Sequence, residues 1–255
     1  MAPPSPAIRR ALVTGSTSGI GRVLAEALAA DGCEVVLTAT DATRVDAAAQ
    51  AFRAKGWRAS GIELRLESPE SVEAALAELT SRFDRLDILV LNAALGGVRV
   101  PMTEYPQDVW RTVFEANVHA TRHLLAGLHP LLARAAAARV LFMSTGVARN
   151  WKASTGAYAA SKAAADAIAQ VYAVEQRGGT IRSNIVNPGP TRTRMRAQAY
   201  PQEDPANLKP PETLLPLLLW LLSAEAPHGE LIDAEAHPLV RLEIARLPTV
   251  PTPLR

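Results

Sequence analysis

Two hydrophobic patterns alternate along the chain. Short apolar runs rich in β-branched residues are separated by longer Ala- and Leu-rich stretches with helical spacing. The short runs predict strands at 11–13, 34–38, 61–66, 87–91, 139–143, 181–186 and 230–232. The longer stretches predict helices at 19–30, 44–54, 69–83, 107–132, 158–176 and 211–223. This order predicts an α/β doubly wound Rossmann fold, in which helices cover both faces of a parallel sheet of about seven strands. Its ligand crevice should lie at the carboxyl ends of the strands.

The length and composition favour one domain. With 255 residues and 48% hydrophobic content, the chain can bury a single large core. We expect residues 11–235 to form that domain, including the substrate site. The proline-rich segment 1–10 is expected to be a flexible tail, and the proline-containing segment 236–255 a second tail that packs on a partner subunit. The polar stretch 192–209 is either a mobile lid or a plain surface loop.

Charge and cysteine content exclude several classes of protein. A net charge of +2, without a stripe of Lys and Arg, argues against disorder and against nucleic-acid binding. The longest apolar run, 214–222, is interrupted by Pro216 and is too short to span a bilayer. The first residues do not resemble a secretory signal, and the single cysteine, Cys33, fits a reducing compartment. We therefore expect a cytoplasmic protein that binds neither nucleic acid nor a membrane, and we expect no metal site.

A glycine-rich turn directly follows the first predicted strand. Residues 14–21 read TGSTSGIG and lead without a break into the first predicted helix. Such a turn presents backbone N–H groups and a helix N-terminus to an anion, and its missing Cβ atoms let a diphosphate approach closely. A tight turn chosen for geometry alone is the alternative reading.

With this turn, the sequence resembles the short-chain dehydrogenases/reductases, in their short single-domain branch. The likeness covers nearly the whole chain, and several independent motifs occur in the order that the family shows. The stretch 191–204 further resembles an uncharacterised bacterial branch of this family. The matching motifs are TGSTSGIG at 14–21, LNAA at 91–94, Asn117, YAASK at 158–162 and NPGPTRT at 187–193.

Tyr158 and Lys162 are the main candidates for chemistry. Four positions apart in a helix, they lie on one face, where the ammonium of Lys162 should favour the phenolate of Tyr158. The resemblance implies that Tyr158 exchanges a proton with a carbonyl or alcohol oxygen while a nicotinamide exchanges hydride, and that Lys162 also binds ribose. It places a hydroxyl donor at Thr145, with Ser144 in reserve, and a water-holding asparagine at Asn117. An ordinary surface Tyr and Lys, and an ordinary helix-bending Asn, are the alternatives.

The end of the second predicted strand bears on the choice of cofactor. Members that bind NAD usually carry Asp at position 39, where this chain has Ala39, so NADP is favoured over NAD. Thr40, with Arg44 and Arg22 nearby in sequence, could bind the 2′-phosphate. The residues expected to bind the cofactor are Gly15, Thr17, Ser18, Gly19, Ile20, Gly21, Thr40, Asn92, Ala93, Tyr158, Lys162, Pro188, Gly189, Thr191 and Thr193.

Some positions depart from the family pattern. The motif around Asn92 lacks the family's first Asn and last Gly, and Arg65 replaces the aspartate that commonly contacts adenine. These changes leave open a dinucleotide-binding sensor or assembly protein without turnover, and an epimerase or dehydratase on the same fold. The main hypothesis is an NAD(P)-dependent oxidoreductase that interconverts a carbonyl and a secondary alcohol, as a homodimer or homotetramer. Arginines at 192, 194 and 196 hint at an anionic substrate.

Overall fold

A parallel sheet forms the centre of the computed structural model, which describes residues 8–247. Within these residues the sheet has seven strands in the order β3-β2-β1-β4-β5-β6-β7, and every pairing is parallel. This confirms the predicted fold class. The strands are β1 (Arg10–Val13), β2 (Glu34–Ala39), β3 (Ala59–Glu63), β4 (Ile88–Leu91), β5 (Ala138–Met143), β6 (Ile181–Asn187) and β7 (Leu231–Asp233).

The strand order places a crevice between β1 and β4. The chain builds outward from β1 through β2 to β3, then returns to place β4 on the other side of β1. The connections that follow β1 and β4 therefore lead away in opposite directions. The carboxyl ends of these two strands border the crevice in which doubly wound sheets hold their ligands. Beyond the paired residues, Thr14 N still donates to Val90 O at 2.9 Å, so the two strand ends stay together up to the glycine turn.

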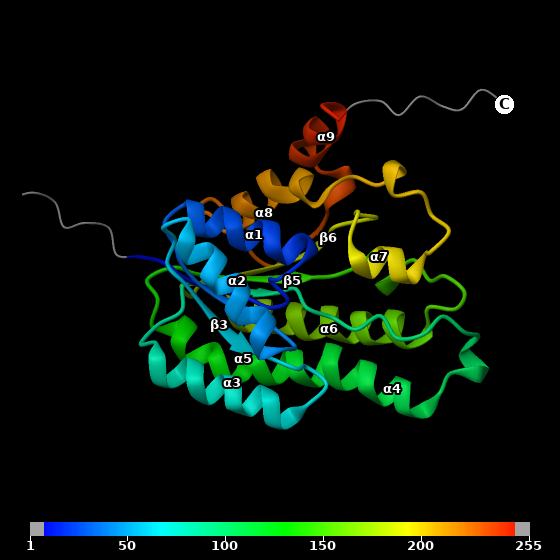
Figure 1. Cartoon of the computed structure of the whole chain (residues 1–255), viewed down its shortest axis with the longest axis horizontal. Coiled ribbons are helices and arrows are strands. Elements are labelled where there is room, and N and C mark those ends of the chain that lie inside the picture. The colour runs from blue at the N-terminus through cyan, green and yellow to red at the C-terminus, as the bar shows by residue number, and fades with distance from the viewer. Residues whose placement is uncertain (1–7, 248–255) are drawn as a thin grey trace, which may run out of the picture.

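Helices cover both faces of the sheet (Figure 1). Side chains of α1, α2 and α8 bury one face, and those of α3, α5 and α6 bury the other. Strands buried on both faces need near-continuous apolar sequence, as the fully buried β4 and β5 have. The α-helices are α1 (Gly19–Ala30), α2 (Ala42–Ala54), α3 (Pro69–Arg82), α4 (Gln107–Phe114), α5 (Ala120–Ala133), α6 (Gly156–Glu175), α7 (Arg194–Ala199), α8 (Leu215–Leu221) and α9 (Pro238–Ala245). Short 3-10 turns lie at Met102–Glu104, Gly146–Ala148, Pro205–Asn207, Pro211–Leu214 and Ala234–Ala236.

The predicted helix 107–132 is interrupted. A π-helical segment, Glu115–His119, separates α4 from α5, and Asn117 lies inside it. Single π turns of this kind often occur at functional sites.

The segment 192–209, expected as a lid or a loop, is fixed at both ends. Arg192 N donates to Lys209 O at 2.9 Å, and the buried Lys209 ammonium donates to Pro190 O at 2.7 Å and to Glu235 at 2.8 Å. Between these ends the segment contains α7 and projects over the carboxyl ends of the strands (Figure 1).

The structure differs from both predicted tails, because each contains residues that belong to a strand or a helix. Strand β1 starts at Arg10, inside the expected tail 1–10. The expected tail 236–255 contains α9, whose Val240 is completely buried in the core with α8. The predictions for residues 1–7 and 248–255 lie outside the described residues. None of the helices between residues 8 and 247 is long and apolar enough to cross a membrane.

Candidate active site

The glycine turn bends where the crevice begins. Gly15 and Gly19 have φ values of 65° and 55°, in the left-handed region that glycine adopts without strain. The turn is held against β2, because Gly15 N donates to Thr38 Oγ1 at 3.0 Å and Thr38 N donates to Ser16 Oγ at 2.9 Å. Ser18 is the N-cap of α1, yet its side chain makes no capping hydrogen bond. The turn thus presents the uncapped start of α1 to the crevice, together with the candidates Thr17, Ser18, Gly19 and Ile20.

Asn92 and Ala93 lie against the same turn. The amide of Asn92 donates to Thr14 O at 2.8 Å, and the Thr14 hydroxyl accepts from the backbone N of Asn92 and of Ala93 at 2.9 and 3.0 Å. Gly21 completes this packing, since a Cβ there would lie 2.5 Å from Asn92 Nδ2 and 2.6 Å from Gly15 O. The lost family residues on either side of Asn92 therefore do not prevent β4 from bracing the turn.

At the carboxyl end of β2, the acidic side chain of Asp41 is engaged within the protein. Ala39 ends the strand, and Asp41 caps α2 by accepting from Arg44 N at 2.8 Å. Arg22, by contrast, pairs with Glu26 one turn along α1, at 3.1 Å. Arg65 pairs with Glu63 at 3.4 Å on the surface. Of the two arginines considered for the phosphate, Arg44 lies four residues after Thr40, in the first turn of α2.

Tyr158 lies at the start of α6 and meets Thr145. Burial raises the pKa of Tyr158 to about 12, against the opposing effect of the nearby Thr145 side chain. Thr145 is extended, with φ −155° and ψ 151°, so its side chain and that of Ser144 point in opposite directions. The Ser144 hydroxyl donates to Asp166 at 2.7 Å, which leaves Thr145 as the hydroxyl beside Tyr158.

Lys162 lies one helical turn after Tyr158. Its ammonium donates to the backbone oxygen of Met143, the last residue of β5, at 2.5 Å, and its side chain is buried. This burial lowers the pKa of Lys162 to about 8, against the opposing effect of the Asp166 carboxylate. The group that lowers the pKa of Tyr158 here is Thr145, so the effect that we expected from Lys162 stays a prediction.

Asn117 connects two walls of the site. Its Oδ1 accepts from Leu95 N and its Nδ2 donates to Leu95 O, both at 2.8 Å, and Nδ2 also donates to Ser161 Oγ at 3.0 Å. Asn117 therefore fixes the loop after β4 to the residue that precedes Lys162.

The last predicted motif closes the site from the side of β6. Gly189 has φ 68°, and Gly189 N donates to Asn187 Oδ1 at 3.1 Å, so the chain turns sharply after Pro188. The Thr191 hydroxyl donates to Gly189 O at 3.1 Å, which tightens the turn. Thr193 caps α7 and lies close to the start of α1, because a Cβ on Gly19 would lie 3.2 Å from its methyl group.

An open pocket of about 470 Å³ lies between α1 and the segment that carries α7. Gly19 and Thr193 form its inner end, next to the glycine turn, while Arg192 and Arg194 line its wall. The two arginines thus face α1. The hint of an anionic substrate, drawn from the arginines of this segment, stays a prediction.

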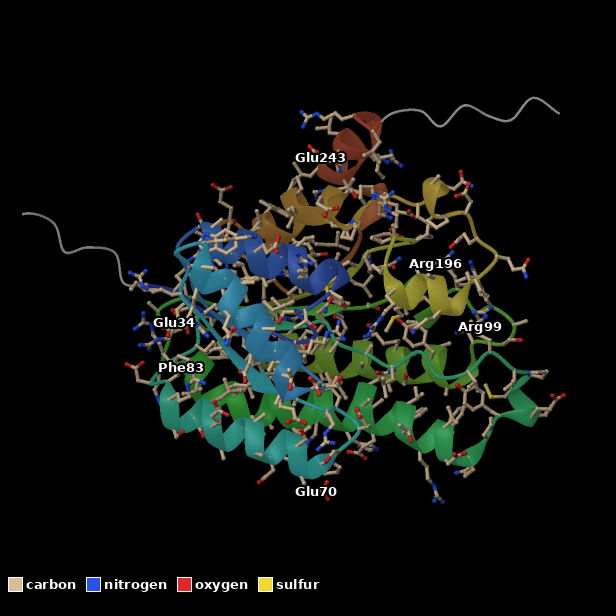
Figure 2. The ribbon with its side chains drawn as sticks, viewed as in Figure 1. Glu34, Glu70, Phe83, Arg99, Arg196 and Glu243 are labelled. Atoms are coloured by element: carbon tan, nitrogen blue, oxygen red, sulfur yellow. The ribbon has the colours of Figure 1, made fainter. Side chains whose placement is uncertain are left out.

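Sequence reasoning missed an aromatic contact between two loops. The guanidinium carbon of Arg99 lies 4.4 Å from the ring centroid of Tyr200, and that of Arg196 lies 3.8 Å from it. Arg196 is also bound to Glu203 by two hydrogen bonds of 2.6 Å. Figure 2 shows Arg99 and Arg196 at the same end of the molecule, on the loop after β4 and on α7. The contact of Tyr200 with Arg99 connects the loop after β4 to the segment that carries α7. Arg196 is held by Tyr200 and Glu203 of its own segment.

A turn for a dinucleotide at the switch point, beside a buried lysine one helical turn after a tyrosine, is the arrangement of a nicotinamide-dependent dehydrogenase. The model of the family described as short chain dehydrogenase matches residues 9–204. The chain therefore belongs to the short-chain dehydrogenase family of oxidoreductases.

Individual relatives resemble the chain over most of its length. The uncharacterised oxidoreductase YciK of Escherichia coli K12 is 36% identical over 230 residues, which cover 89% of this chain and 91% of that protein. A short chain dehydrogenase from Shigella flexneri 2a, crystallised with NADP, superimposes with a TM-score of 0.84 at 37% identity, covering 89% of this chain and 97% of the other. One from Escherichia coli CFT073, crystallised with NADPH, has a TM-score of 0.83 at 37% identity, with 88% and 95% covered.

Proposed function

We propose that this protein is an NADP(H)-dependent oxidoreductase that interconverts a carbonyl and a secondary alcohol. The observation that carries the proposal is the meeting of Thr145, Tyr158 and Lys162 at the carboxyl end of β5, two strands along the sheet from the glycine turn that follows β1. Their hydroxyl, phenol and ammonium groups are those that proton transfer to a carbonyl oxygen requires.

The proton steps follow from the geometry. A bound nicotinamide would supply or accept the hydride. Tyr158, whose raised pKa keeps it protonated near neutral pH, donates its proton to the carbonyl oxygen during reduction and takes one back during oxidation. Thr145 hydrogen-bonds the same oxygen, while Lys162 binds the ribose and stabilises the charge that Tyr158 acquires. Asn117 holds a water that returns the proton through Lys162.

The turn fits a dinucleotide phosphate, and the end of β2 fits NADP. At Gly15 and Gly19 the backbone adopts left-handed conformations that glycine takes without strain, and the start of α1 has no side-chain cap. Two similar structures hold NADP and NADPH, which supports the same cofactor here. Thr40 and Arg44 are the proposed partners of the 2′-phosphate, because Asp41 is engaged in capping α2.

A titration tests the cofactor without a substrate. Energy transfer from the four tryptophans to reduced nicotinamide should report NADPH binding at least about tenfold tighter than NADH, the effect of one charge-assisted contact. Arg44→Gln should remove most of this preference by weakening NADPH alone. Arg53→Gln, on the same helix, is the matched control. If the protein bound neither cofactor, the proposed enzymatic function would be rejected. That result would favour a protein that has kept the fold without its activity.

The hydroxyl beside Tyr158 gives a second prediction. Thr145→Val keeps the shape but removes the hydrogen bond, and it should lower kcat for carbonyl reduction about tenfold, the value of one net hydrogen bond. Thr145→Ser should keep wild-type activity to within a small factor. Equal rates for the valine and serine variants would show that Thr145 does not contact the reacting oxygen.

The rim of the site favours a substrate with an apolar body. Large apolar side chains are exposed on the three segments that surround Tyr158, namely Val98 and Met102 after β4, Trp151 after β5 and Met195 on α7. Trp151 is 83% exposed and Met102 59%. Apolar surface of this kind commonly marks a binding site, so a screen should begin with apolar ketones and aldehydes.

We further propose a cytoplasmic homo-oligomer. Val171 and Val174 are more than half exposed on α6, and a two-fold contact between copies of this helix would bury them. The single cysteine, Cys33, is buried, as suits a reducing compartment.

A further inference from the structure

A buried carboxylate lies under the proposed active site. Asp166 is on α6, one turn after Lys162, and only 9% of it is exposed. Its Oδ2 accepts from the Ser144 hydroxyl at 2.7 Å and from the Arg149 guanidinium at 2.6 Å. A buried aspartate is costly unless it is paired, and the proton chemistry proposed above does not use this one.

Both donors come from the strand and loop that carry Thr145. Ser144 precedes it, and Arg149 follows it in the loop between β5 and α6. Asp166 therefore ties this strand end to the helix that carries Tyr158 and Lys162. The short, charged side chain of an aspartate can accept both hydrogen bonds, from Ser144 and from Arg149, at one position on α6.

The charges around Asp166 indicate what it does. The charged and titratable groups that act on it from the elements packed against it are Lys162 on its own helix and Arg149 from the loop. It acts in turn on Lys162, whose ammonium form it favours, and on Tyr158, whose phenolate form it disfavours. Arg149 is about one-third exposed, so water screens its charge more than that of the buried Lys162.

We propose that Asp166, held in place by Ser144 and Arg149, is a positioning residue that fixes the chain at the end of β5 to α6 and presents a buried carboxylate one helical turn from Lys162. The inference rests on the proposed function only for its catalytic consequence. Burial alone favours a neutral lysine, which could neither stabilise a phenolate nor donate all of its hydrogen bonds. The carboxylate opposes this effect from one turn away.

The test is a direct titration of Lys162. The chain has four lysines, so NMR of protein labelled with ¹³C at lysine Cε should give four resonances, and Lys162→Arg identifies the one from Lys162. In Asp166→Asn, which keeps an acceptor for Ser144, we expect the pKa of Lys162 to fall from about 8 to about 7, as for the loss of one nearby opposite charge. Asp46→Asn removes an exposed carboxylate on α2 and should leave the midpoint unchanged.

A second variant keeps the test decisive if Asp166→Asn does not fold. Arg149→Gln removes the competing cation and retains the carboxylate, so the pKa of Lys162 should rise. An unchanged Lys162 midpoint in a folded Asp166→Asn, or in Arg149→Gln, would overturn the inference. Where a carbonyl is reduced, the alkaline limb of kcat/KM should move with the Lys162 midpoint. A shifted midpoint without reduction of any carbonyl would retain the inference and reject the proposed function.

Discussion

Tyr158→Phe is expected to lower kcat for carbonyl reduction by about 10² to 10⁴, the range for loss of a general acid. The substitution removes one oxygen and keeps the ring, and Thr145 and Lys162 remain in place. NADPH affinity should therefore change by less than about threefold, since the lost group binds the reacting oxygen rather than the phosphates. Steady-state rates on any carbonyl that the wild-type protein reduces, combined with the NADPH titration, measure both effects.

A second tyrosine on the same helix, the buried Tyr172, is the matched control. Tyr172 bonds His129 Nδ1 through its hydroxyl at 3.1 Å, far along α6 from the glycine turn. Tyr172→Phe should cost about 1 kcal/mol of stability, as for a lost hydrogen bond, and leave kcat unchanged. Wild-type turnover by Tyr158→Phe would reject Tyr158 as the proton donor, whereas equal losses in both variants would point to a general disturbance of α6.

Gly21→Ala should weaken NADPH binding about 10²-fold. Alanine favours a helix by about 1 kcal/mol over glycine, but here its Cβ would overlap Asn92 Nδ2 at 2.5 Å and the Gly15 carbonyl at 2.6 Å. Overpacking of this kind typically costs about 1 to 3 kcal/mol, and backbone cannot move aside as cheaply as a flexible side chain. The displaced groups belong to the proposed phosphate-binding turn, so binding should suffer as well as stability, with Tm lower by about 5 °C.

Gly96→Ala separates this effect from the general cost of a methyl group. A Cβ at Gly96 would meet no atom within 4 Å, so both Tm and NADPH affinity should stay at wild-type values. The two variants are compared by thermal unfolding with and without NADPH. If Gly21→Ala bound NADPH as tightly as Gly96→Ala, the turn would not be the phosphate site.

Where local sequence carries a strong signal, the fold was predictable. The first helix was predicted at 19–30 and forms as Gly19–Ala30, because the glycine turn fixes its start and Gly32, with φ 85°, lies just past its end. The π turn at Asn117 was not predictable, since its stabilising bonds to Leu95 and Ser161 come from elements distant in sequence. Helix α9 was missed because prolines near the end of the chain suggested a tail, whereas Val240 makes the segment part of the core.

The same distinction applies to the candidate site, where features set by local sequence were predictable and features set by distant contacts were not. Tyr158 and Lys162 are one turn apart on a helix, so their spacing alone predicted that they act together. The resemblance placed the hydroxyl donor at Thr145 with Ser144 in reserve, but sequence alone could not show that Ser144 is engaged by Asp166 across the interface between β5 and α6. Asp166 follows Lys162 by four positions, which was a visible signal, but sequence alone could not show that it is buried. The contact of Tyr200 with Arg99 joins loops that only the fold brings together.

The strand order also has a consequence for synthesis of the chain on the ribosome. The interior strand β1 is made before the other strands of the sheet, but one of its neighbours is β4, and Ala11 pairs with Ile88. At about 5 to 20 residues per second, the intervening stretch takes about 4 to 15 s to synthesise. Throughout this interval one edge of an apolar strand lacks its partner, and such edges are sites of wrong pairing. A strand that is paired on both edges in the finished sheet is thus open to wrong pairing while the chain is being made.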